Sequence, residues 1–358
     1  MYSLKLLALA LALVAGHCVA APPVDVLDQP AQSSKLADRS PLLDLAQAGK
    51  RLIAVGQRGH ILYSDDQGIH WTQARVPVST DLNAVQFATE QQGWAVGHDG
   101  VVLHSRDGGS SWEKQLDGRQ LGRLMQQYYS ARSESEQWQE LSKRIETEGA
   151  DKPFLDLWFS DELNGFVVGA FNLIFRTRDG GKSWEPWADR IDNPSGYHLN
   201  AIADDGKHLF IAGEQGLLVR LADNGERFQA LTTPYEGSFF GLSAQPGMLL
   251  AYGLRGHVYR SKDEGLSWTK VPTGLNSSIT ASASDRHGQL YLFAQTGQVL
   301  ASKDQGEHFQ SLDLGPSAPI YGAMLAEQNR LLLVGPRGIS QRLLVPVQQE
   351  DKRGAPHG

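Results

Sequence analysis

The chain has 358 residues, with 33 lysines and arginines against 40 aspartates and glutamates, which gives a formal net charge of −7. This acidic balance argues against nucleic acid as a partner, because phosphate binding relies on clustered positive charge. The single cysteine, Cys18, allows no intrachain disulfide, and no stretch beyond the first twenty residues approaches the length of a membrane helix.

The first twenty residues predict an export signal. Lys5 precedes an apolar run from Leu6 to Gly16, and Cys18-Val-Ala20 places small residues before a cleavage point at Ala21. An uncleaved anchor is the alternative, while the bulky His17 argues against a lipoprotein. Cleavage removes Lys5 and the cysteine, so the net charge becomes 32 − 40 = −8. Export without cysteines predicts a periplasmic protein.

An eight-residue box recurs along the rest of the chain, with the pattern Ser/Thr, any, Asp, any, Gly, any, any, aromatic. In a tight hairpin the hydroxyl and the carboxylate bond to turn backbone, the glycine supplies a positive φ, and the aromatic ring packs beneath. The pattern resembles the Asp-box, or bacterial neuraminidase repeat, and we interpret its acids as structural. They are Asp66, Asp107, Asp179, Asp223, Asp263 and Asp304, and only the Asp223 box, which begins at Leu221, lacks the hydroxyl.

Each box follows an apolar strand that ends in a Gly turn, and there are seven such turns. Successive box aspartates are 41, 72, 44, 40 and 41 residues apart. A period of 40 to 45 residues with four short strands is typical of a β-propeller blade. The sequence therefore predicts an all-β, seven-bladed β-propeller of four-stranded antiparallel blades over residues 40–347. The turns begin at Gly56, Gly97, Gly169, Gly213, Gly253, Ala294 and Gly335.

Three segments fall outside this period. The long interval holds an insertion at 117–152 between blades two and three, with apolar residues at helical spacing. Its apolar faces either pack onto the propeller or form a binding surface for a partner protein. Blade seven is one strand short, so we expect the N-terminal segment 21–39 to close it, with Val24–Leu27 as the outer strand. Residues 348–358 are charged and are expected to be disordered.

A column of small residues recurs on the inner strands. We interpret it as filling the rim of the central channel and bonding to neighbouring backbone. A channel cation held by Asp44 and Asp156 is the alternative, with only two carboxylates to hold it. We predict no metal and no cofactor. The column reads Asp44, Asn83, Asp156, Asn200, Gly241, Thr280 and Gly322.

Strand order separates the two faces of the ring, because successive turns of an antiparallel blade alternate between its ends. The boxes lie on one face, and the Gly turns and the insertion lie on the other. Arg58, Arg255 and Arg337 occupy equivalent places in the Gly turns of blades one, five and seven. Arginine suits carboxylate and carbonyl recognition. Solvated side chains, a partner-docking patch and a small-anion clamp are the three interpretations.

Catalysis is not predicted. A sialidase-like glycosidase resembles this chain in its boxes, but it needs an arginine trio, an acid/base carboxylate and a Tyr–Glu pair. No Arg-Ile-Pro motif occurs, Tyr235 and Glu236 are adjacent on one loop, and the histidines show no metal-type pair. A glycoside hydrolase or a passive glycan-binding module remains the alternative function.

The export signal and the seven repeats together resemble the photosystem II stability/assembly factor propellers, over residues 40 to 345. The resemblance implies a non-catalytic protein that binds newly made membrane proteins through an arginine-rich patch, here Arg58, Arg255 and Arg337. We therefore expect a periplasmic, monomeric assembly factor or scaffold for a membrane protein or envelope complex, without nucleic acid or a small-molecule substrate. The insertion and the negative charge depart from the family and leave the partner and a photosynthetic host open.

Overall fold

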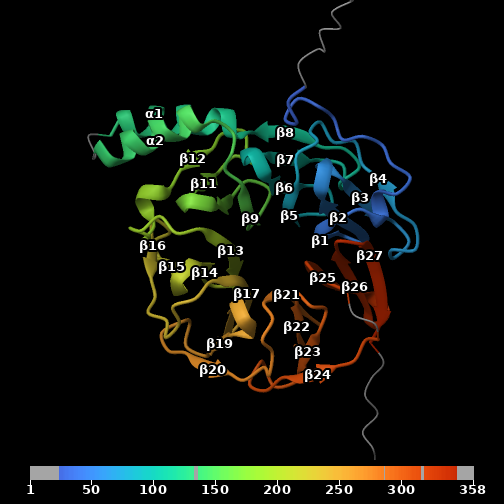
Figure 1. Cartoon of the computed structure of the whole chain (residues 1–358). Helices are drawn as coiled ribbons and strands as arrows, with labels where there is room; N and C mark the ends of the chain where they lie inside the picture. Colours follow the sequence, from blue (N-terminus) through green and yellow to red (C-terminus); the bar gives the residue numbers. More distant parts are fainter. Residues whose placement is uncertain (1–23, 133–135, 286, 316–317, 345–358) are drawn as a thin grey trace, which may run out of the picture.

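The computed structural model describes residues 24–132, 136–285, 287–315 and 318–344, which form seven antiparallel sheets around a ring (Figure 1). Six sheets have four strands in chain order, and the last has three. This arrangement confirms the predicted propeller fold. No helix in the described part of the chain is long and apolar enough to cross a membrane. The predicted signal and tail lie outside the described residues.

The strands follow the chain from the centre of the ring outward. Blade one holds β1 (Leu42–Ala48), β2 (Arg51–Gly56), β3 (Ile61–Ser64) and β4 (Thr72–Gln73). Blade two holds β5 (Leu82–Phe87), β6 (Gly93–Gly97), β7 (Val102–Ser105) and β8 (Glu113–Leu116). Blade three holds β9 (Phe154–Phe159), β10 (Gly165–Gly169), β11 (Ile174–Thr177) and β12 (Glu185–Pro186). Blade four holds β13 (Leu199–Asp204), β14 (Leu209–Gly213), β15 (Leu218–Leu221) and β16 (Phe228–Ala230).

The remaining blades repeat this order. Blade five holds β17 (Phe239–Gln245), β18 (Met248–Gly253), β19 (Val258–Ser261) and β20 (Thr269–Val271). Blade six holds β21 (Ile279–Ser284), β22 (Leu290–Ala294), β23 (Val299–Ser302) and β24 (Gln310–Leu312). Blade seven holds β25 (Gly322–Ala326), β26 (Arg330–Gly335) and β27 (Gly338–Leu343).

The core lies between neighbouring blades, because each sheet is covered on both faces. Every residue of β6 and of β10 is buried, as expected for short apolar strands sandwiched between sheets. Trp94 of blade two stacks on Phe159 of blade three, with ring centroids 3.7 Å apart and planes 8° apart. Blade-to-blade packing of this kind supplies most of the apolar burial that stabilises the ring.

Five of the six boxes share one hydrogen-bond network. In blade two, Ser105 Oγ donates to Asp107 Oδ1 at 2.9 Å and accepts from the Gly109 amide at 2.8 Å, while the Ser111 amide donates to the same carboxylate at 2.9 Å. Asp223 departs from this pattern. Leu221 offers no hydroxyl there, and the Asp223 side chain is 85% exposed. The same network surrounds Asp66, Asp179, Asp263 and Asp304.

The boxes also join the blades. A side chain of the preceding blade donates to a box carbonyl at five junctions, including the one between blade seven and blade one. These bonds tie successive hairpins around the ring and give the boxes an architectural role. They run from Arg51 to Gly108, Gln115 to Gly180, Arg176 to Gly225, Arg260 to Gln305 and Arg330 to Gln67, at 2.7 to 3.3 Å.

The inner column forms a second set of links around the channel. Asp44 accepts from the Val85 amide at 2.9 Å, and Asp156 accepts from the Ile202 amide at 2.8 Å. Burial raises the pKa of Asp44 to about 6 and that of Asp156 to about 7. No group of three or more metal-type ligands occurs in the described segments. Three other side chains of the column also bond to the following blade, each by donating to a backbone carbonyl. The bonds run from Asn83 to Phe154, from Asn200 to Phe239 and from Thr280 to Ile320.

The insertion between blades two and three folds as two helices, α1 (Gly118–Ser130) and α2 (Glu136–Glu148). Its apolar side chains pack onto blade three: Tyr129 and Ile145 share one buried cluster with Phe154. Tyr129 is 1% exposed, and Trp138 of α2 stacks on it. In Figure 1 both helices lie outside the ring beside β11 and β12. Of the two interpretations of the apolar faces, packing onto the propeller is the one observed.

The predicted closure of blade seven by Val24–Leu27 is wrong. The Ser79 amide donates to the Val26 carbonyl at 2.8 Å, and the Ala31 amide donates to the Val76 carbonyl at 3.1 Å. This segment therefore runs antiparallel along the outer side of blade one. Leu27 is 1% exposed there, in an apolar cluster shared by blades one and two. Burial of Leu27 and the polar contacts described below favour this edge over that of blade seven.

The ring is instead closed by the 3-10 turn η1 (Ala37–Arg39), which packs against blade seven at the start of β27. A Cβ on Gly338 would lie 2.0 Å from the Asp38 carbonyl oxygen, just as one on Gly59 would lie 2.2 Å from the Val78 carbonyl oxygen. Asp38 therefore takes the place that a blade-to-blade connection takes elsewhere. Blade seven keeps three strands within the described residues.

Candidate docking surface on the Gly-turn face

The sequential strand order places the Gly turns and the boxes on opposite faces of the ring. We call the first of these the Gly-turn face. Arg58 lies in η2 (Gln57–Gly59) and Arg255 in η7 (Leu254–Gly256), each at the tip of its turn. Arg337 lies in the two-residue turn between β26 and β27. The three predicted arginines thus share one face.

The turns hold these side chains outward. Arg58 and Arg255 adopt φ values of 58° and 56°, in the left-handed region. The amide of Arg58 donates to Asp81 Oδ1 at 2.8 Å, which fixes that turn. All three arginine side chains are exposed, and none of them forms a hydrogen bond or an ion pair with the described part of the chain. Their guanidinium groups remain available to a partner.

Ring order brings two of the three together. Arg58 and Arg337 belong to blades one and seven, which are neighbours, whereas blade six separates Arg255 from Arg337. An exposed arginine that sequence reasoning missed, Arg39, lies between them. A Cβ on Gly338 would lie 2.6 Å from Arg39 Cα, and Arg39 and Arg58 line the same cleft. We call Arg39, Arg58 and Arg337 the arginine row.

A signal for Arg39 existed in the sequence. Asp38 precedes Leu42 by four residues, just as Val78 precedes Leu82, so the segment around Asp38 corresponds to the connection before blade two. The expectation that segment 21–39 closes blade seven, with Val24–Leu27 as the outer strand, leaves this correspondence unused.

Two members of the arginine row, Arg39 and Arg58, line a cleft of about 1050 Å³ between blade one and the N-terminal segment. Arg39, Arg58, Leu36 and Val26 line it together with serine and glutamine side chains, and no carboxylate does. Leu36 is 60% exposed and Val26 is 41% exposed. The cleft therefore combines positive charge with apolar surface, which suits a peptide segment that carries both acidic and apolar side chains.

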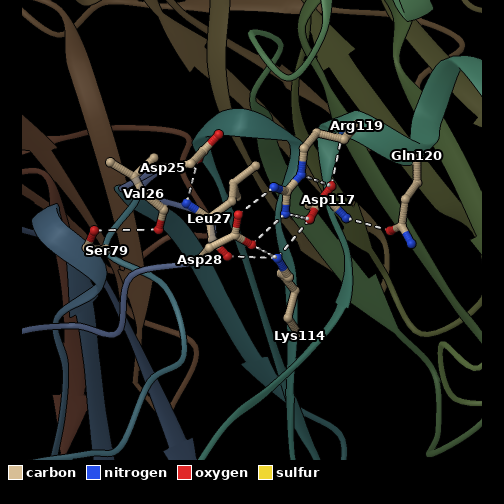
Figure 2. Close-up of polar contacts among 9 residues, drawn as sticks. All are labelled: Asp25, Val26, Leu27, Asp28, Ser79, Lys114, Asp117, Arg119 and Gln120. Atoms are coloured by element: carbon tan, nitrogen blue, oxygen red, sulfur yellow. Dashed lines mark hydrogen bonds and ion pairs between the residues drawn. The ribbon is translucent and has the colours of Figure 1, made fainter. Parts of the chain in front are cut away.

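A polar latch holds the outer wall of this cleft in place (Figure 2). Arg119 at the start of α1 donates to both carboxylate oxygens of Asp28, at 2.7 and 2.9 Å, and to Asp117 at 2.7 Å. Lys114 Nζ donates to the Leu27 carbonyl at 2.7 Å. The hydrogen bonds from Arg119 lower the pKa of Asp28 to about 2. The helical insertion and the N-terminal segment are thereby joined.

The tyrosine expected of a glycosidase is not arranged as a nucleophile. Tyr235, the candidate nucleophile, is 9% exposed, and its hydroxyl donates to the Leu254 carbonyl at 3.3 Å. Its ring packs against Phe239, with centroids 4.9 Å apart. A nucleophilic tyrosine needs an adjacent base and access to substrate, and this geometry offers Tyr235 neither.

Comparisons with known proteins agree with this picture. The chain is 27% identical over 173 residues to a photosystem II assembly lipoprotein Ycf48 of Synechococcus, covering 46% of this chain and 50% of that protein. A Ycf48 of Prochlorococcus marinus is 24% identical over 273 residues, covering 70% of this chain and 79% of that protein. For the first three curated relatives that match, the aligned region spans about half the length of the relative.

Solved structures show the same fold. A structure described as YCF48 bound to D1 peptide superposes with a TM-score of 0.63 at 16% identity, covering 90% of this chain and all of that one. YCF48 from Cyanidioschyzon merolae gives 0.63 at 14% identity, with 88% and 98% coverage. The model of the family described as photosynthesis system II assembly factor YCF48 matches residues 26–123 and 130–289. With most of its propeller matched, this chain belongs to the YCF48 family of photosystem II assembly factors.

Proposed function

We propose that this protein is a non-catalytic, exported assembly or stability factor that binds an exposed segment of a membrane protein at the arginine row. The observation that carries the proposal is the row itself. Its three arginines are exposed and have no side-chain partners within the described residues, and two of them, Arg39 and Arg58, line a cleft that no carboxylate lines. Membership of a family of assembly factors supports a binding role over an enzymatic one.

The row also refines the choice among the predicted arginines. Arg58 and Arg337 are expected to act together with Arg39, while Arg255 on blade five lies outside the row. We therefore expect charge reversal at Arg255 to weaken binding less than reversal at Arg58. A small-anion clamp is disfavoured, because a cleft of about 1050 Å³ is much larger than a single small anion needs.

The test is recovery of partners from envelope extracts. Arg58→Glu combined with Arg337→Glu should lower recovery of a specific membrane protein by about tenfold, because like charges then face the partner's carboxylates. Arg106→Glu combined with Arg178→Glu is the matched control, since these two exposed arginines undergo the same double charge reversal in boxes on the opposite face. Equal recovery with the double variant and with the control would refute the docking assignment.

Two further measurements bear on location and partner. Fractionation should find the protein in the periplasm after cleavage near Ala21, and a cytoplasmic location would refute export. The structure titled YCF48 bound to D1 peptide supplies a probe for the partner. Binding of a D1 peptide that weakens with Arg58→Glu would indicate a photosystem II partner. Recovery of a different membrane protein without D1 binding would indicate another envelope complex.

A further inference from the structure

Blade seven presents an edge strand unlike those of the other blades. The outer strands of blades one to six have two to four residues, and several carry a charge or proline that discourages further pairing. In blade seven the outermost strand of the described chain is β27, which has six residues. A long edge strand presents a row of main-chain groups that another strand can use.

The pairing of β27 with β26 shows which groups face outward. The Leu344 amide donates to the Asn329 carbonyl at 2.9 Å, so alternate residues back along β27 also bond to β26. The amide and carbonyl groups of Ile339, Gln341 and Leu343 therefore point away from β26. Within the described chain, no backbone group pairs with them on that side.

Equivalent groups are bonded in the other blades. Ile61, which corresponds to Ile339 in the first blade, accepts from the Ala74 amide of the outer segment at 2.8 Å. In blade three the Trp187 amide donates to the Ile174 carbonyl at 2.9 Å, and in blade four the Leu231 amide donates to the Leu218 carbonyl at 2.9 Å. The position beside β27 is thus one that a fourth strand fills elsewhere in the ring.

A small cleft adjoins this edge on the side of blade six. It has a volume of about 300 Å³, and Leu314, Ile320 and Leu333 form its apolar wall. Arg337 and Arg342 also line it, and no carboxylate does. Arg342 already donates to the Leu314 carbonyl at 3.2 Å, whereas the Arg337 side chain has no partner in the described structure. Arg337 lies at the Gly-turn end of β27.

Neither the segment at 25–34 nor the sequence of residues 348–358 offers a good strand for this position. The segment at 25–34 is bonded along blade one. Residues 348–358 contain charged residues, two glycines and a proline, without a β-branched or aromatic residue. Such a composition disfavours a strand.

We propose that the edge of β27 accepts an extended segment of the partner protein as the fourth strand of blade seven. By analogy with the other blades this segment runs antiparallel to β27, so it ends at the Gly-turn face. It places an apolar side chain against Leu314 and Leu333 and an acidic side chain beside Arg337. The inference rests on the proposed function, because Arg337 also belongs to the arginine row.

The test uses two amidated eight-residue peptides of alternating threonine and valine, one with glutamate at the seventh position and one with glutamine. Binding of the glutamate peptide should slow amide exchange at Ile339, Gln341 and Leu343 at least about tenfold at saturation. Leu343→Pro removes one outward amide from an exposed position and should weaken binding about fivefold, whereas Leu343→Ala should not. Arg337→Gln should abolish the preference for glutamate over glutamine.

Three results would overturn this inference: no binding up to roughly 1 mM, unchanged exchange at the three amides, or equal binding by Leu343→Pro and Leu343→Ala. Faster exchange at these amides after deletion of residues 348–358 would also overturn it, because the tail would then occupy the edge. The proposed function fails separately. If Arg58→Glu abolishes partner recovery while Leu343→Pro leaves recovery and peptide binding unchanged, only the edge assignment is lost.

Discussion

The two channel aspartates should make the stability of the ring fall as the pH rises. Asp156 has a pKa of about 7 and Asp44 of about 6, against an ordinary value of 3.8, mainly because the buried sites disfavour the charged form. Between pH 3.8 and these raised pKa values, the native state binds more protons than the unfolded state. The stability contribution is therefore full below pH 3.8 and is lost as the pH rises through 6 to 7.

The magnitude follows from the shifts. Each pKa unit corresponds to about 1.4 kcal/mol, so the rise at Asp156 corresponds to about 4 kcal/mol and that at Asp44 to about 3 kcal/mol. Both side chains keep some contact with the channel, where water reduces the penalty. We therefore expect Asp156→Asn to gain about 2 to 4 kcal/mol over the wild type at pH 8. The amide oxygen of the new side chain still accepts from Ile202.

Urea unfolding at half-unit steps from pH 4.5 to pH 8 measures this difference. The wild-type free energy of unfolding should decline across the range, and the decline should be smaller in Asp156→Asn. At pH 4.5 the two proteins should differ by less than about 1 kcal/mol. Asp179→Asn is the control of opposite sign, because hydrogen bonds lower the pKa of that box aspartate. Parallel pH profiles for the wild type and Asp156→Asn would refute this account.

Three further predictions test the architecture, and the free energy of unfolding is the measurement for each. Leu27→Ala should cost about 2 to 4 kcal/mol, because Leu27 is buried between blades one and two, and a loss below about 0.5 kcal/mol would contradict that docking. Asp179→Ala should lower the free energy of unfolding by about 1 to 3 kcal/mol, whereas Asp223→Ala should change it by no more than about 0.5 kcal/mol. Equal effects of the two substitutions would contradict the difference between their boxes. Gly338→Ala should cost at least about 2 kcal/mol more than Gly206→Ala, because only the added Cβ at Gly338 would clash with another segment, the Asp38 carbonyl of η1. Similar losses for the two substitutions would contradict ring closure by η1.

The repeats were readable because box and Gly turn are local signals. Ser105, Asp107 and Gly109 bond to one another within five residues, so their pattern alone indicates the hairpin. Once seven such units are counted, strand order and the two faces follow from antiparallel pairing. The fold, and the placement of three arginines on one face, were predictable for this reason.

Ring closure was not readable in this way, because it depends on contacts between distant segments. The apolar alternation of Val24–Leu27 fits the edge of either blade. Two contacts place the segment on blade one and not on blade seven. Leu27 is buried there, and Asp28 accepts a hydrogen bond from Arg119, some ninety residues later in the chain. The correspondence of Asp38 with Val78 was the one local clue, and it placed Arg39 at the junction.

An acidic protein can present a positive docking surface because its charges are distributed unevenly between the faces. On the box side, several basic side chains pair with neighbouring acids: Arg51 pairs with Asp65 at 2.6 Å, and Arg220 pairs with Glu264 at 3.2 Å. The arginine row has no such internal partners within the described structure. Exposed charges are screened beyond about 10 Å in ordinary salt, so a partner at the row experiences the nearby arginines more strongly than the net charge of −7. The net charge of the whole sequence argues against nucleic acid as a partner, but it does not argue against an acidic peptide at this junction.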